Sequence, residues 1–292
     1  MNACIHSRMR AATGASYGRA AWLLLFACLL VAAALSATPA AFATPGSHEA
    51  VSAVAILVYH RFSDAADDSM TVRVATFEAH LRFLKEHGYA IVPLRRIVAW
   101  LREPGATLPP KAIALTVDDG HQSVYERLLP IALSEQLPIT LFVCPSAISN
   151  ASYALDWTQL RTLHASGLFD VQSHSGWHPN FNVERRRESP AEFESFATDQ
   201  LQHSRKMIES KIGVHVDMLA WPFGIYDDDV IRIAGRLGYL AGFTLNARRL
   251  DGSSPLLALP RFLMVDDVTP GVLGRLIGGR DTPAVRAHET RP

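Results

Sequence analysis

The sequence predicts an α/β fold, a distorted (β/α) barrel that forms a single domain. Apolar runs of strand length alternate with segments of helical period along most of the chain. The run at residues 112–117 is apolar apart from one threonine, which is typical of a parallel strand covered on both faces. Repeated βα units over about 250 residues fit one barrel better than two domains.

In the first half of the chain, predicted strands and helices alternate. Phe77, Leu81 and Leu84 are spaced as on one face of a helix, and that helix is expected to end at Gly88. The other predicted elements here are strands 54–59, 91–94, 112–117 and 139–143 and helices 97–101 and 124–136.

The second half repeats this order. Its longest predicted helix, residues 191–212, is preceded by Ser189-Pro190 and followed by Gly213, which favour a helix start and a helix end. The remaining predicted elements are helices 158–166 and 227–237 and strands 169–172, 218–221 and 240–245.

The first 43 residues differ from the rest and predict a signal peptide. They carry three arginines, no acidic residue and one apolar run at 21–35. That run is short against the roughly 20 residues that span a bilayer, and Ala-Phe-Ala at 41–43 matches a cleavage site. We therefore expect an exported chain, periplasmic or secreted, with no stable membrane span after cleavage. The expected division is signal peptide 1–43, linker 44–53, folded domain 54–280 and flexible tail 281–292.

Charge and cysteine content exclude other classes. Removal of residues 1–43 takes three of the 28 basic residues and leaves 25 against 28 acidic ones, a net charge of −3. Nucleic-acid-binding domains are typically basic, so we expect no nucleic-acid partner. Cys144 is the only cysteine left after cleavage, so no internal disulfide is expected, and its place after an apolar run favours core packing.

Polar residues gather where predicted strands end. One strand runs directly into Asp118-Asp119, and another into a loop that contains His174 and His178. Either pair alone is common on protein surfaces, but barrel strands bring their carboxyl ends to one face. One carboxylate and two imidazoles would supply three ligands and leave open positions, as a catalytic divalent metal requires. Zinc is the expected ion, with nickel, cobalt or iron as alternatives, and the second carboxylate is then free to act as a base.

These motifs resemble those of the polysaccharide deacetylases of the NodB-homology type, also called carbohydrate esterase family 4. Thr-Val-Asp-Asp-Gly at 116–120 is similar to the family's T-F-D-D-G, and His-Ser-Gly-Trp-His at 174–178 fits its H-[S/T]-x-x-H. The resemblance covers most of residues 54–280 and implies a polysaccharide deacetylase domain with a distorted (β/α) barrel. It also implies that Asp118 is the catalytic base and that the metal is held by Asp119, His174 and His178.

The sequence departs from the family pattern in two motifs. The family's R-x-P-Y corresponds best to residues 220–223, where Ala220 replaces the arginine that orients the base. The family's late Leu-x-His, the usual source of the general acid, has no counterpart, and Leu-Pro-Arg at 259–261 is the nearest segment. With Tyr59-His60 near the start, these departures resemble the subgroup that deacetylates poly-β-1,6-N-acetylglucosamine.

That closer resemblance implies roles for three further residues. His60 would be the general acid, and the backbone N–H of Phe223 would face the oxyanion of the tetrahedral intermediate. Arg261 would replace the missing orienting arginine, or else serve as a structural ion-pair partner. Trp177 and Trp221 are candidates for stacking on sugar rings, although aromatic residues near strand ends also cap cores.

The expected activity is metal-dependent hydrolysis of N-acetyl groups on an extracellular polymer that contains N-acetylglucosamine, with poly-β-1,6-N-acetylglucosamine as the first choice. Peptidoglycan, chitin oligomers or an O-acetyl ester are alternative substrates. A non-catalytic, metal-containing carbohydrate-binding module is an alternative of another class. Retention of both Asp118 and His60 favours the enzyme, because neither is needed merely to hold metal or sugar.

Overall fold

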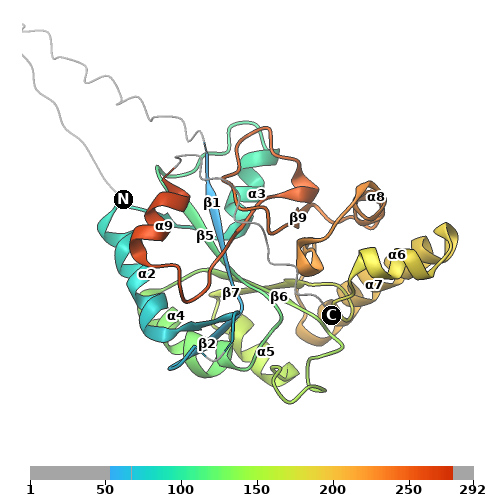
Figure 1. Cartoon of the computed structure of the whole chain (residues 1–292), viewed down its shortest axis with the longest axis horizontal. Coiled ribbons are helices and arrows are strands. Elements are labelled where there is room, and N and C mark those ends of the chain that lie inside the picture. Colours follow the sequence, from blue (N-terminus) through green and yellow to red (C-terminus); the bar gives the residue numbers. More distant parts are fainter. Residues whose placement is uncertain (1–52, 67, 279–292) are drawn as a thin grey trace, which may run out of the picture. The chain divides into compact units, whose positions relative to one another are not determined.

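The computed structural model describes residues 53–66 and 68–278, which form one α/β domain (Figure 1). The predicted signal peptide, nearly all of the linker and the predicted tail lie outside these residues. The main sheet contains β1 (Ala55–Tyr59), β4 (Ala90–Ile91), β5 (Ala112–Val117), β6 (Ile139–Val143), β7 (Phe169–Ser173), β8 (Met218–Ala220), β9 (Ala241–Phe243) and β10 (Phe262–Leu263). A separate two-stranded parallel sheet pairs β2 (Arg61–Ser63) with β3 (Thr71–Arg73).

Helices follow most of these strands, as the alternating pattern predicts. In Figure 1, β1 and β5 lie in the middle of the view, with α2 and α9 on one side and α7 and α8 on the other. The helices are α2 (Val74–Glu86), α3 (Leu94–Arg102), α4 (Leu129–Glu135), α5 (Trp157–Ala165), α6 (Phe181–Arg187), α7 (Pro190–Ile212), α8 (Asp228–Arg236) and α9 (Pro270–Ile277). Short helical turns are η1 (Val124–Leu128), η2 (Pro222–Gly224) and η3 (Leu256–Ala258).

The main sheet is parallel throughout and runs in the order β10-β1-β5-β6-β7-β8-β9, with β4 paired to the start of β5. Each βα unit thus adds its strand close to the previous one. The carboxyl ends of the strands meet at one edge, so the polar segments after β1, β5, β7 and β8 are brought together.

Residues 259–263 draw the two ends of the curled sheet toward each other. On one side, Leu259 donates its N–H to Gly242 at 2.7 Å and accepts from the N–H of Thr244 at 2.8 Å. On the other side, Phe262 lies in parallel register with Leu57 of β1. The prediction of a distorted (β/α) barrel is therefore confirmed in the form of a curled half-barrel sheet, and Arg261 stands at the centre of the joining segment.

Two buried clusters lie on the two faces of the strands. Leu57, Leu115 and Leu141 belong to the larger cluster, which includes core residues of α2, α5 and α7. Their chain neighbours Ile56, Ala114 and Phe142 belong to the second cluster. Side chains alternate between faces along a strand, so His60 and Asp118, each at an even-numbered position, continue the face of the second cluster.

Two differences from the predicted elements arise at prolines. The predicted helix 124–136 begins as the π-turn η1, because Pro130 has no N–H to donate to the carbonyl of Glu126. The predicted strand 91–94 stops at Ile91, because Pro93 caps the start of α3. The long helix begins as predicted: Ser189 and Glu192 form a capping box, and Gly213 ends the helix with a φ of 83°.

Short elements escaped the sequence interpretation. Only Phe181 is buried in α6, so no apolar stripe marks that helix, and β10 has only two residues. In α9, Gly274 passes so close to α2 that an added Cβ would lie 2.7 Å from the ring of Phe83. None of the helices in the described part of the chain is both long enough and apolar enough to cross a membrane.

Candidate active site

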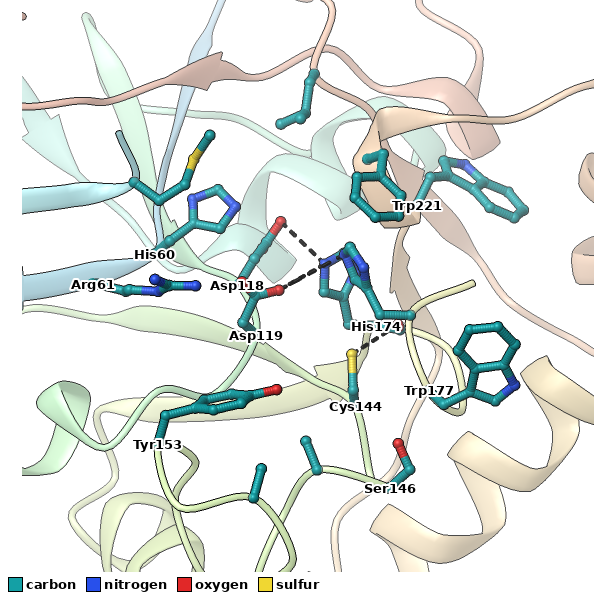
Figure 2. A pocket seen from close by; sticks show the side chains of 16 residues that line it. His60, Arg61, Asp118, Asp119, Cys144, Ser146, Tyr153, His174, Trp177 and Trp221 are labelled. Atoms are coloured by element: carbon teal, nitrogen blue, oxygen red, sulfur yellow. Dashed lines mark hydrogen bonds and ion pairs between the residues drawn. The ribbon is translucent and has the colours of Figure 1, made fainter. Parts of the chain in front are cut away.

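Asp119, His174 and His178 form a cluster suited to a divalent metal. One ligand atom of each lies within 4.8 Å of the others. The Asp119 Oδ1 is 3.5 Å from the His174 Nε2 and 3.8 Å from the His178 Nε2. The structure thus brings together the three residues that the sequence predicts as ligands, and Figure 2 shows two of them, Asp119 and His174, facing each other. One carboxylate and two imidazoles match the donors of catalytic zinc sites, so the residues fit the expected ion.

The loops that carry the cluster have unusual backbone geometry. Asp119, Ser175 and His178 have φ values of 72°, 64° and 64°, in the left-handed region that non-glycine residues rarely adopt. Residues in such conformations typically cost about 1–3 kcal/mol each and collect at functional sites. Successive side chains of a strand point to opposite faces, and the left-handed turn at Asp119 ends this alternation. Asp118 and Asp119 therefore both line the same cavity.

A hydrogen bond to a backbone carbonyl fixes the orientation of the His174 ring. Its Nδ1 lies 2.8 Å from the carbonyl oxygen of Ala220, which can only accept, so Nδ1 carries the proton and Nε2 is left to bind metal. Burial lowers the pKa of His174, but Asp118 and Asp119 outweigh it and raise the pKa overall. Burial and the neighbouring His174 lower the pKa of His178 to about 4, so His178 is neutral at neutral pH, as a metal ligand must be.

Arg261 binds Asp118 in the buried centre of the site. Its Nη1 and Nη2 donate to the two carboxylate oxygens at 2.8 and 2.7 Å. Nη1 also donates to the Thr116 hydroxyl and Nε to the Thr244 carbonyl, both at 3.1 Å. Arg261 is fully buried and Asp118 is 1% exposed. Burial raises the pKa of Asp118, but Arg261 and His174 outweigh it and lower that pKa, which keeps the carboxylate ionised.

Arg261→Met is expected to destabilise the fold by about 3–5 kcal/mol near neutral pH, because the charge of Asp118 stays buried without a partner. Because the pKa of Asp118 is lower in the folded chain than in the unfolded chain, its ionised form stabilises the fold above the unfolded-state pKa. That stabilisation is lost as the pH falls through the folded-state pKa. Without Arg261, burial raises the pKa of Asp118 in the folded variant, so its carboxyl is protonated as the pH falls and the loss caused by the substitution should shrink from neutral pH downward. Thermal unfolding of metal-free wild type and variant across pH measures this, and a difference that does not vary with pH would contradict it.

His60 is buried at the end of β1, in the wall of the same cavity. The preceding residue, Tyr59, accepts the Asp118 N–H at 2.9 Å, which ties the two strand ends together. Among the described residues, His60 Nδ1 has no hydrogen-bond partner, and buried polar atoms of this kind usually face a ligand or water. Burial lowers the pKa of His60 although Asp118 and Asp119 oppose it, so its protonated form is a stronger acid than ordinary imidazolium.

Exposed aromatic side chains surround a cavity of about 540 Å³ that contains these residues. Tyr153, Trp177 and Phe223 line it and are 49%, 48% and 55% exposed. The sequence singled out Trp177 and the backbone of Phe223, whose φ of 56° is again left-handed. It missed Tyr153, which lies in a turn-rich segment with no motif around it.

The interpretation of Trp221 as a stacking platform is wrong. Trp221 is 0% exposed, and its indole N–H donates to the carbonyl of Leu257 at 2.8 Å. The ring also packs edge-on against Phe181. Trp221 therefore forms part of the inner wall of the cavity, but its side chain is fully buried and no face of its ring is open to a sugar.

Comparison with known proteins supports the resemblance found in the sequence. Residues 105–242 match the family model described as polysaccharide deacetylase. The poly-beta-1,6-N-acetyl-D-glucosamine N-deacetylase of Escherichia coli K12 is 25% identical over 84% of this chain and 43% of its own length. The protein of the same name from Staphylococcus aureus MRSA252 is 22% identical over 76% of this chain and 77% of its own. The chain thus spans less than half the length of the E. coli relative.

Two solved structures share the fold. The deacetylase PplD of Streptococcus pyogenes in complex with acetate has a TM-score of 0.68 and 23% identity, over 77% of this chain and 98% of its own. IcaB from Ammonifex degensii also has a TM-score of 0.68, with 21% identity over 79% of this chain and 99% of its own. The family model and the named relatives confirm the resemblance to the polysaccharide deacetylases that the motifs at 116–120 and 174–178 carry, and the solved structures share its fold.

Proposed function

We propose that this protein hydrolyses N-acetyl groups on an amino-sugar polymer, as a metal-dependent deacetylase. One observation carries the proposal: a buried Asp118, held through both carboxylate oxygens by Arg261, lies next to the three-ligand cluster and lines the same open cavity. A site that only held metal or sugar would have no need of this second carboxylate. The proposed ion is zinc, because two imidazoles and one carboxylate are its usual catalytic ligands.

The residues have distinct roles in this proposal. Asp119, His174 and His178 hold the metal, which supplies Lewis-acid polarisation of the acetamide carbonyl and lowers the pKa of water. Asp118 accepts the proton of the attacking water, and Arg261 orients its carboxylate. His60 donates a proton to the nitrogen of the departing amine. The N–H of Phe223 faces the developing oxyanion, and the exposed ring of Trp177 stacks on sugar.

We propose poly-β-1,6-N-acetylglucosamine as the substrate, on the names of the E. coli and S. aureus relatives. Acetate release should be measured from this polymer, from peptidoglycan and from chitin oligomers, with Asp118→Asn as the inactive control. Fastest release from the β-1,6-linked polymer supports the substrate. Faster release from another polymer would replace it, and no release from any acetylated glycan would leave only a binding module.

We also propose that the chain is exported and cleaved after Ala43. The proposal rests on the arginine-rich start, the apolar run at 21–35 and the small residues around the expected cleavage site. Intact-mass analysis of protein from the periplasm and the medium should give an N-terminus at Thr44. A chain that keeps Met1 and stays with the inner membrane would contradict this.

A further inference from the structure

A second cavity lies directly beside the one that contains the metal cluster. The two share Ser146 and Trp177, and the second has a volume of about 500 Å³, within the range of small-molecule sites. Apart from Gly176, its remaining lining residues all come from α7: Asp199, Gln200, Gln202, His203 and Lys206. We call this cavity the α7 groove. None of the proposed catalytic or metal-binding residues lines it.

The α7 groove has the chemistry of a sugar site. Asp199, Gln202, His203 and Lys206 are spaced i, i+3, i+4 and i+7, so they share one face of the helix, and all four are exposed. Among the described residues, the side-chain ion pairs of α7 use Glu194, Arg205 and Glu209, and not Asp199 or Lys206. The groove therefore offers both hydrogen-bond donors and acceptors beside an indole ring, which suits the hydroxyl groups and apolar face of a neutral sugar.

A fixed junction joins the α7 groove to the metal cluster. Gln200 of α7 accepts the backbone N–H of Trp177 at 3.2 Å through its Oε1. Gly176 allows this approach, because a Cβ there would lie 2.5 Å from the same oxygen. Trp177 lies between the ligands His174 and His178 in the sequence, so the bond holds the ligand loop on α7. The groove therefore has a set position relative to the metal cluster.

The groove extends the catalytic cavity in one direction. In the view of Figure 2, Trp177 and Ser146 lie on the opposite side of the catalytic cluster from His60 and Arg61. The half-exposed Trp177 forms part of the wall of both cavities. A ligand that continues from the first cavity past Trp177 would thus meet the polar face of α7. A polymer has such a continuation, whereas a single sugar does not.

We propose that the α7 groove is a second sugar subsite, which binds the neighbouring N-acetylglucosamine unit of the chain whose acetamide lies at the metal cluster. This inference rests on the proposed deacetylase function and deepens it. The groove adds binding to oligomers and none to single sugars. Because it lies on one side of the cavity, it also sets the path that the polymer takes away from the metal cluster.

The test combines two substrates with a double variant, Asp199→Ala with His203→Ala, and a matched control. Acetate release is measured from a β-1,6-linked N-acetylglucosamine pentamer and from the monomer. For the pentamer, the KM of the double variant should rise roughly 5- to 30-fold, the loss expected for one or two hydrogen bonds, with kcat little changed. Monomer hydrolysis should be unaffected. Lys211→Ala, on the exposed last turn of α7 and outside the groove, should behave as wild type.

Direct binding separates failure of this inference from failure of the proposed function. Calorimetric titration of the pentamer into wild type and double variant measures the subsite without turnover, and the double variant should bind more weakly. An equal Kd for both proteins, or an unchanged KM for the pentamer, would overturn the subsite. Absence of acetate release from wild type, with a weaker Kd for the double variant, would leave the subsite standing and refute the deacetylase.

Discussion

His174→Ala and His178→Ala should each lose the bound divalent ion and, with it, nearly all acetate release. Each substitution leaves only two of the three protein ligands that lie within 4.8 Å of one another. Loss of a residue that merely orients a ligand typically costs about 10–100-fold in metal affinity, so loss of a ligand should cost more. Metal content per chain, measured after dialysis of purified protein, should fall from about one ion to near zero.

His87→Ala is the matched control for these two variants. His87 is exposed, stacks on Phe83 in α2 and does not line the catalytic cavity, so its removal should leave metal content and activity unchanged. Wild-type metal content in both ligand variants would show that the ion is held elsewhere. Loss of metal with full activity would refute metal-dependent hydrolysis.

The strand ends made the metal cluster predictable from the sequence. An apolar strand followed at once by Asp118-Asp119 places carboxylates at the mouth of a parallel sheet, and β7 delivers His174 in the same way. These inferences need only local sequence and the parallel arrangement of strands, which is why they could be made for single residues. The structure adds that His60 and Asp118 continue the same face of their strands.

The partner of Asp118 was harder to predict. Arg261 lies 143 residues further along the chain, on a segment whose two-residue strand gives almost no local signal. Its place follows from how the sheet curls, because residues 259–263 pair with β9 and β1 at once. The sequence therefore left open whether Arg261 was an orienting group or an ion-pair partner of another residue. The bidentate contact supports the first reading.

Exposure of aromatic side chains is also a tertiary property. Trp177 and Trp221 both follow strand ends, yet the first is half-exposed and the second fully buried. The difference arises from packing, since Trp221 contacts Phe181 of the unpredicted helix α6 and donates to Leu257 of the unpredicted turn η3. Tyr153, in turn, is placed by tertiary contacts with residues 121 and 122: its carbonyl accepts the N–H of Gln122 at 2.8 Å, its ring stacks on His121, and its neighbour Ala154 forms a β-bridge with His121. Neither environment leaves a trace in sequence periodicity.

Asp118→Asn and His60→Gln should separate chemistry from metal binding. Neither residue belongs to the three-ligand cluster, so both variants should keep about one ion per chain. An amide cannot accept the proton of water, and a glutamine can hydrogen-bond but cannot cycle a proton at neutral pH. Each variant should therefore lose roughly 10²–10⁴-fold in kcat, the usual contribution of a positioned proton acceptor or donor. Acetate release, metal content and circular dichroism are measured on the same preparations.

The two substitutions also distinguish proton transfer from structural support. If His60 only stabilised the end of β1 through a hydrogen bond, His60→Gln would release acetate nearly as fast as wild type. The proton donor would then have to be another histidine. His121, two residues after Asp119 and hydrogen-bonded to Ser123, would be the first to test. Asp267→Asn, an exposed position outside the cavity, controls for the loss of one negative charge. Loss of metal in Asp118→Asn would instead make Asp118 a ligand, and the base would have to be sought elsewhere.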